Sequence, residues 1–185
     1  MRMKRAFHNI ALAALLCGVP LLAAAQDGNR VDTLLDRLAQ PDLRNWSVIE
    51  EEIYMLWLRS GSASADYLLS QGRAALAAGD MEAAYNHLTA LTDHAPEFAE
   101  GWNARATMFF EANRYGPSIA DIQRVLALEP RHFGALTGLG FMLEDMGQLE
   151  DALRAFRAAQ AIHPHRDEIN EAVNRVERAL GGQTL

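Results

Sequence analysis

The stretch LALEPRHFGALTGLG, residues 126–140, decides the fold of this chain. It places Pro130 between two apolar segments, and a proline ends a helix because it lacks the backbone N–H and fixes φ. Pro96 and Pro164 lie at equal distances before and after Pro130 along the chain. Three of the six prolines therefore recur at one interval, which indicates a repeated unit of that length.

Three consecutive segments, residues 65–98, 99–132 and 133–166, have the same residue types at the same places when they are aligned on these prolines. Apolar residues recur at places 4, 11 and 24, and small residues recur at places 8 and 20. Each segment therefore predicts one helix, a turn, a second helix and a proline stop. The turn formers at place 15 are Gly79, Asn113 and Gly147.

This interval and pattern resemble the tetratricopeptide repeat (TPR), a helix–turn–helix unit with the same period. The resemblance implies an all-α fold, a right-handed α-solenoid of stacked helix pairs that curve around a groove. Three copies are covered, as TPR 1 (65–98), TPR 2 (99–132) and TPR 3 (133–166). The copies depart from the family pattern at Ala75, where a bulky aromatic is usual, and at Ser118, where alanine is usual.

Helical segments flank the repeats on both sides. Residues 26–64 predict an N-terminal helical hairpin and its connector, with Pro41 between the two helices, and we expect the hairpin to stack on the first repeat. Ser47 and Glu50 predict a capping box at the start of the second helix. Residues 167–185 predict a C-terminal capping helix and tail. The apolar side of that helix consists of Ile169, Val173, Val176 and Leu180.

Residues 1–25 have the three parts of a secretory signal peptide. A start with three basic residues and no acid is followed by the apolar run IALAALLCGVPLL and by AAA. We expect cleavage between Ala25 and Gln26, and therefore a periplasmic or secreted protein, with a Gram-negative periplasm favoured. An uncleaved membrane anchor is the alternative.

Cys17 is the only cysteine and lies in the predicted leader, so cleavage leaves no disulfide, thiol nucleophile or thiolate ligand. Leu16 precedes it where a lipoprotein needs a small residue, so we do not expect lipidation. Cleavage also makes the net charge of −7 more negative by three. An acidic chain disfavours nucleic acid and anionic membranes as partners, and it favours basic or apolar segments.

In proteins with this repeat, places 2, 5, 9, 12 and 13 usually line the groove, so the resemblance assigns the first helix of each pair to its wall. The candidate partner-binding residues are Leu69, Arg73, Leu76, Asn103, Thr107, Phe110, Glu111, Thr137, Phe141, Glu144 and Asp145. This mixture of apolar residues and acids suits an amphipathic helix, or an extended apolar segment with basic flanks. Packing of Phe110 and Phe141 against neighbouring helices is the alternative.

One branch of the family grips a peptide's terminal carboxylate with lysine, asparagine and arginine at set places. Of the residues at these places in this chain, only Arg73 could bind a carboxylate, so the resemblance does not imply that activity. The acids Glu50–Glu52 are expected in the first turn of a helix, where the macrodipole favours them. The histidines of the connectors between repeats are expected to be exposed near helix C-termini rather than bound to a metal. They are His94, His132, His163 and His165.

These features indicate a protein-binding module rather than an enzyme, with no cofactor and no metal. The sequence contains no nucleophile elbow, phosphate-binding glycine loop or HExxH pattern. We expect an envelope adaptor that holds a partner segment in its groove. A structural subunit of a larger envelope complex, held by the convex face or the N-terminal hairpin, is the alternative, and a regulator of a cell-wall enzyme is a third.

Overall fold

The computed structural model describes residues 19–182, and all regular secondary structure in this part of the chain is helical. The basic start, Cys17, most of the apolar run of the predicted leader and the last three residues of the tail lie outside it. The helices are α1 (Val19–Leu38), α2 (Trp46–Trp57), α3 (Ala63–Ala77), α4 (Met81–His94), α5 (Ala99–Glu111), α6 (Tyr115–Leu128), α7 (Phe133–Asp145), α8 (Leu149–Ile162) and α9 (Asp167–Gly182).

The three predicted repeats are the helix pairs α3/α4, α5/α6 and α7/α8, and the predicted all-α TPR solenoid is confirmed. Each pair turns where the sequence places a residue that tolerates a left-handed backbone. The φ angles are +75° at Gly79, +56° at Asn113 and +75° at Gly147. Asparagine is among the residues that reach this region most readily after glycine, so the second repeat keeps the same turn.

The small residues at places 8 and 20 let the two helices of a pair approach closely. A Cβ atom at Gly72 would lie 2.4 Å from Leu88, and one at Gly140 would lie 2.5 Å from the ring of Phe156. In the second repeat, the Ser118 hydroxyl donates a hydrogen bond of 2.7 Å to the carbonyl of Ala106. This buried bond accounts for the serine at a place where the family usually has alanine.

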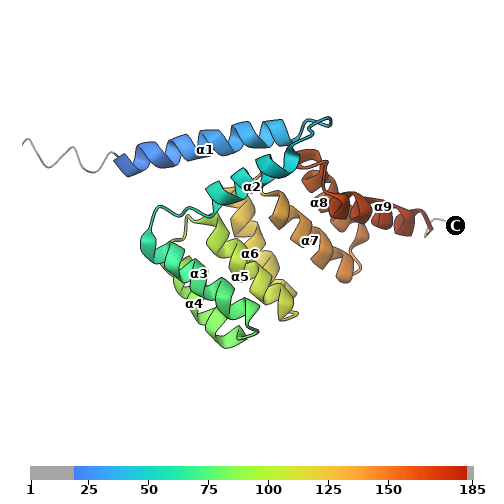
Figure 1. Ribbon diagram of the computed structural model, residues 1–185. Helices are drawn as coiled ribbons and strands as arrows, with labels where there is room; N and C mark the ends of the chain where they lie inside the picture. Colours follow the sequence, from blue (N-terminus) through green and yellow to red (C-terminus); the bar gives the residue numbers. More distant parts are fainter. Residues whose placement is uncertain (1–18, 183–185) are drawn as a thin grey trace, which may run out of the picture.

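Successive pairs stack so that the first helices form one inner layer. α3 contacts α5 and α5 contacts α7, while α4 packs on α5, α6 on α7 and α8 on α9 (Figure 1). The Arg105 guanidinium links these layers, because it donates to both carboxylate oxygens of Asp121, at 2.7 and 2.8 Å, and to the Thr92 hydroxyl at 2.8 Å. The predicted capping helix, α9, covers the last repeat with its buried side, Ile169, Ala172, Val173 and Val176.

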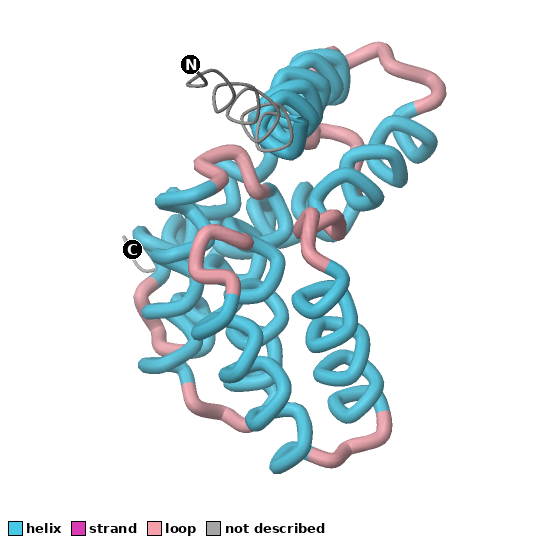
Figure 2. The backbone as a smooth tube through the Cα atoms, turned by 90° about the vertical axis from the view of Figure 1, so that its left-hand side faces the viewer, coloured by secondary structure: helices cyan, strands magenta, loops and turns pink. Residues whose placement is uncertain are grey.

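The N-terminal hairpin, α1 and α2, does not stack on the first repeat, so that prediction is wrong. It lies along the edge of the array where the connectors between repeats lie, and α1 crosses above the repeat helices (Figures 1 and 2). Leu35 of α1 and Ile53 of α2 share one hydrophobic core with Phe133 at the start of α7, and Ile162 at the end of α8 packs against it. The hairpin therefore covers the joints on either side of the third repeat.

Polar contacts between residues far apart in the sequence hold the hairpin in this place. The Arg166 Nε donates to Glu50 Oε1 at 2.7 Å, and Nε2 of the half-buried His165 lies 3.1 Å from the carbonyl oxygen of Leu38. The capping box predicted at Ser47 and Glu50 is absent, because α2 already begins at Trp46. Glu50 therefore lies beyond the first turn, and its carboxylate is available for Arg166.

The described residues include no helix that is both long enough and apolar enough to cross a membrane. The predicted cleavage site, Ala25–Gln26, falls inside α1. Two anchoring contacts of α1 lie beyond this site: the ion pair of Arg30 with Glu52, and the packing of Leu34 and Leu35 in the core of the hairpin. Cleavage at the predicted site would leave these anchors in place.

Candidate functional site

The eleven candidate binding residues all lie on α3, α5 and α7, the helices of the inner layer. Four of them are exposed: Arg73, Thr107, Glu111 and Asp145. Five are half-buried: Leu76, Asn103, Phe110, Phe141 and Glu144. The remaining two, Leu69 and Thr137, are buried. The wall of the inner layer, defined here by the nine residues of the first two groups, is thus more polar than the sequence pattern indicates.

Leu69 and Thr137 belong to the interior of the array. Leu69 joins the core between the first and second repeats, with Leu88 and Met108. The Thr137 hydroxyl donates a hydrogen bond of 2.8 Å to the carbonyl of Phe133, one turn earlier in α7. Neither side chain is available to a partner on the wall.

The two phenylalanines of the wall are held by neighbouring rings. Phe110 stacks on Tyr115 with 5.8 Å between ring centroids, and Phe141 meets Phe156 edge to face at 5.1 Å. The Arg175 guanidinium of α9 lies 5.9 Å from the centroid of Phe141. These contacts favour packing as the main role of both rings, because aromatic pairs of this geometry stabilise a core.

Two of the acids in the C-terminal half of the wall have partners within the chain. Both carboxylate oxygens of Glu144 accept hydrogen bonds of 2.7 Å from Arg175. Asp145 accepts one of 2.9 Å from the Tyr115 hydroxyl, which raises the pKa of Tyr115. Among the described residues, no basic side chain lies within 4 Å of the Glu111 carboxylate. Glu111 is therefore the free acid of the wall.

A buried carboxylate, Glu100, lies at the start of α5 and is only 4% exposed. Its Oε2 accepts a hydrogen bond of 3.1 Å from Asn103 and lies 3.3 Å from His132 Nε2, while its Oε1 lies 3.5 Å from Arg73 Nη1. The Nδ1 of His132 accepts from the Ala135 N–H at 3.0 Å. His132 therefore has its proton on Nε2, which donates to Glu100. Place 2 of the second repeat puts Glu100 on the groove side, as the sequence pattern predicts, but its pairing with His132 was missed because His132 was expected to be an exposed connector residue.

The prediction that the connector histidines are exposed is right for His94 and wrong for His132 and His163, which are 1% and 0% exposed. The hairpin covers both: Trp57 stacks on His132 at 4.2 Å, and Trp46 meets His163 edge on at 5.4 Å. No group of three or more described histidines, cysteines or acids is arranged to hold a metal.

His163 lies against the hairpin with its Nε2 3.3 Å from Glu50 Oε1. Neither ring nitrogen makes a hydrogen bond of good geometry with a described residue. Burial lowers the pKa of His163, the nearby Glu50 carboxylate raises it, and the Arg166 guanidinium lowers it further. The net shift of the pKa is downward, so the buried site favours the neutral ring.

A cavity of about 640 Å³ separates the hairpin from the connectors of the first two repeats. We call it the hairpin cavity. Its walls are residues 95–100, the middle of α1 and the end of α2 with the residues that follow it, while Glu129 and His132 lie on the side of the second connector. The apolar part includes Val31, Leu56, Trp57 and Phe98, and the charged part is Arg59, Glu97, Glu100 and Glu129.

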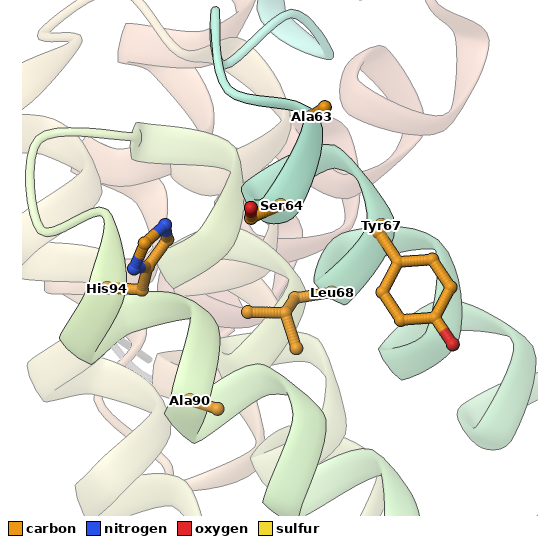
Figure 3. Close-up of a pocket in the computed structure, with 6 residues that line it drawn as sticks. All are labelled: Ala63, Ser64, Tyr67, Leu68, Ala90 and His94. Atoms are coloured by element: carbon orange, nitrogen blue, oxygen red, sulfur yellow. The ribbon is translucent and has the colours of Figure 1, made fainter.

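A shallow, open depression of about 650 Å³ lies on the outer face of the first repeat, which the hairpin does not cover. Tyr67 from α3 and His94 from α4 stand on opposite sides of Leu68 and Ala90 (Figure 3). Tyr67 is 62% exposed, which is unusual for a large aromatic in a packed array. We call this surface the end face.

Stacked helix pairs that recur at the interval of the prolines define the class of this protein as a helical-repeat solenoid. No protein-family model matches the chain. It is 34% identical over 161 residues to a TPR repeat-containing protein of Rhizobium etli, a match that covers 86% of this chain and 79% of that one. The chain therefore belongs to the TPR repeat-containing proteins.

Solved structures show the same fold. The first TPR domain of Spaghetti (RPAP3), bound to an HSP90 peptide, is similar with a TM-score of 0.62 and 20% identity, over 65% of this chain and 95% of that one. The Sgt2 TPR domain from Aspergillus fumigatus is similar with a TM-score of 0.62 and 19% identity, over 66% of this chain and 83% of that one.

Proposed function

We propose that this protein is a non-enzymatic adaptor that binds a partner peptide or helix on the wall formed by α3, α5 and α7. The observation that carries the proposal is the wall itself: three first helices, each in contact with the next, that present exposed or half-buried side chains along one surface. Such a preformed surface binds a segment without the entropic cost of ordering the receptor.

The charges of the wall favour a partner with basic flanks over an acidic chain terminus. The TPR domain of Spaghetti is solved with the peptide SRMEEVD, which ends in acids and a carboxylate. In this chain Arg73 is the single cation of the wall, and its guanidinium already lies 3.5 Å from Glu100. Glu111 stands free further along, so a terminal carboxylate would meet more repulsion than attraction.

In vivo crosslinking tests the adaptor proposal. A photo-crosslinking residue at Thr107, which is exposed in the middle of the wall, should capture a protein partner. Combining it with Arg73→Glu and Glu111→Lys should abolish capture, because the charge pattern of the wall is then reversed. The matched control is Arg154→Glu, a charge reversal at an exposed residue of α8. Equal capture by the wall variant and the control would reject the wall as the binding surface.

The second candidate is a structural subunit held by its outer surfaces, and the end face favours it. Each later repeat is covered by the helix before it, but Tyr67 and the depression beside it are open. Tyr67→Ser should remove a stoichiometric partner that is bound at this face and should leave capture through Thr107 unchanged. The reverse result favours the adaptor.

We also propose that the protein is exported and cleaved between Ala25 and Gln26, and that it acts in the cell envelope. The support is the three-part leader in the sequence, together with anchoring contacts of α1, at Arg30 and Leu35, that lie beyond the cleavage site. The test is the mass of the protein recovered from a periplasmic fraction. A protein that begins at Gln26 agrees with the proposal, and an uncleaved chain retained with membranes contradicts it.

A further inference from the structure

We propose that the hairpin cavity binds a basic side chain, lysine or arginine, of the partner segment. This inference rests on the proposed adaptor function and adds a second, charge-selective contact at the edge of the wall. The cavity, at about 640 Å³, has the size of sites that hold small organic groups. It is far larger than one basic side chain needs, so backbone atoms of the partner can enter with it.

The charges of the cavity select a cation. Three carboxylates line it, from Glu97, Glu100 and Glu129, against the single guanidinium of Arg59. Glu97 is at the rim, with its side chain 78% exposed, and is paired with Arg124 at 2.7 Å. Glu100 already has partners within the chain. Glu129 thus decides the selectivity of the site.

Glu129 is a half-buried carboxylate without an ion pair among the described residues, since no basic nitrogen lies within 4 Å of it. Burial raises its pKa, the more distant His132 lowers it in part, and the Asp32 carboxylate raises it again. The net shift is upward. A cation that binds beside this carboxylate stabilises its charged form, because the cation supplies the missing charge-assisted hydrogen bond.

The rest of the cavity fits the stem of a lysine or arginine. Val31, Leu56 and Phe98 offer apolar surface to the methylene groups, and the buried Trp57 side chain lines the same cavity. Glu100 connects the cavity to the wall, since Arg73 approaches the same carboxylate from α3. A segment lying on the wall can therefore reach the cavity with a basic residue at its end.

The test uses blocked amino acids, which are too small to need the wall. N-acetyl-lysine methylamide and its arginine counterpart should perturb the indole N–H signal of Trp57 in the NMR spectrum of the intact protein. The uncharged norleucine counterpart, with a similar stem, should need at least about tenfold higher concentration for the same shift. Equal binding of norleucine, or no shift of the Trp57 signal, would overturn the proposal.

Variants then assign the charge. Glu129→Gln should weaken the lysine compound by about tenfold or more, while Glu150→Gln on the exposed side of α8 should not change it. Unchanged binding by Glu129→Gln would overturn the assignment. If Glu129→Gln does not fold, the comparison of lysine with norleucine on the unaltered protein still decides. If spermidine binds far more tightly than both blocked amino acids, the cavity is a site for a free polyamine, and the proposal that it binds a side chain of the partner is overturned.

The cavity and the adaptor function can fail separately. If Thr107 captures no partner but the lysine compound still binds through Glu129, the adaptor proposal fails and the cation site stands. If capture depends on the wall but norleucine binds as well as lysine, the adaptor proposal stands and the cavity assignment fails.

Discussion

The repeats and the N-terminal hairpin are held together in different ways. In the repeats, the same kind of contact recurs between the two helices of a pair: a small residue at place 8 lies against a large one at place 24, as at Gly72 with Leu88 and Gly140 with Phe156. The hairpin has no such recurrence. It is held by single contacts to distant residues, among them the ion pair of Glu50 with Arg166. A repeated contact can be predicted from spacing, whereas a contact that occurs once cannot.

The largest loss of stability is expected from disrupting a contact that recurs in the repeats. Gly140→Ala places a Cβ atom 2.5 Å from the ring of Phe156, which is fully buried and cannot move away. We expect the free energy of unfolding to fall by about 1–3 kcal/mol, the range for overpacking a core. Chemical denaturation followed by circular dichroism measures it.

Gly138 provides the matched control on the same helix. A Cβ atom there meets nothing within 4 Å, so Gly138→Ala should leave stability unchanged or raise it by up to about 1 kcal/mol through helix propensity. A loss of similar size in both variants would show that the helix, and not the approach to Phe156, is sensitive at these positions.

A smaller and local effect is expected from the hairpin contact. Glu50→Gln removes the charge that pairs with Arg166, whose side chain is 31% exposed and can turn towards water. We expect docking of the hairpin to weaken by about 1–2 kcal/mol. Hydrogen exchange should then quicken by about 5–30-fold in α1 and α2.

The amides of α3 and α4 are the internal reference for this measurement, because the hairpin does not cover the first repeat. Their exchange should stay unchanged in Glu50→Gln. If hydrogen exchange quickens equally in α1 to α4, the hairpin and the repeats unfold as one unit. The claim that the two regions are stabilised separately would then be wrong.

The sequence predicted the repeats well because several independent signals agree at each place. Gly79, Asn113 and Gly147 all have the left-handed φ that their turn needs. It placed the hairpin wrongly because an amphipathic helix shows that one side is buried, without showing against what. The residue that completes the hairpin core is Phe133, which the repeat register treats as an ordinary first position of TPR 3.

The sequence predicted the helices that carry the candidate site but not the burial of each side chain, because burial depends on contacts that occur only once. Place numbers put all eleven candidates on the inner helices, but Leu69 and Thr137 turn into the core. The burial of His132, the partner of Glu100, depends on Trp57 of the hairpin, which covers His132 from outside the repeats. The sequence did contain a signal for this burial. Trp46 and Trp57 are the first and last residues of one helix, and large aromatic residues at both ends indicate that the helix packs against other parts of the protein.

The smallest change in hairpin docking is expected from lowering the pH, which acts on the hairpin through protonation of His163. Its folded-state pKa lies below the ordinary value of 6.5, because burial outweighs the attraction of Glu50, while Arg166 and His165 oppose protonation. Below pH 6.5 the undocked state binds more protons than the docked one, so docking weakens as pH falls and levels off below the folded-state pKa. Above pH 6.5 this histidine contributes no pH dependence.

Hydrogen exchange of α1 and α2 across this range, with α3 and α4 again as reference, measures the effect. Glu50 offsets part of the burial, so the loss should be smaller than in Glu50→Gln. His163→Leu should flatten the pH dependence of the hairpin amides, because it fills the same space without a titrating ring. A hairpin in His163→Leu that still loosens with acid would assign the dependence to other groups, and the single-contact view of hairpin docking would have to include them.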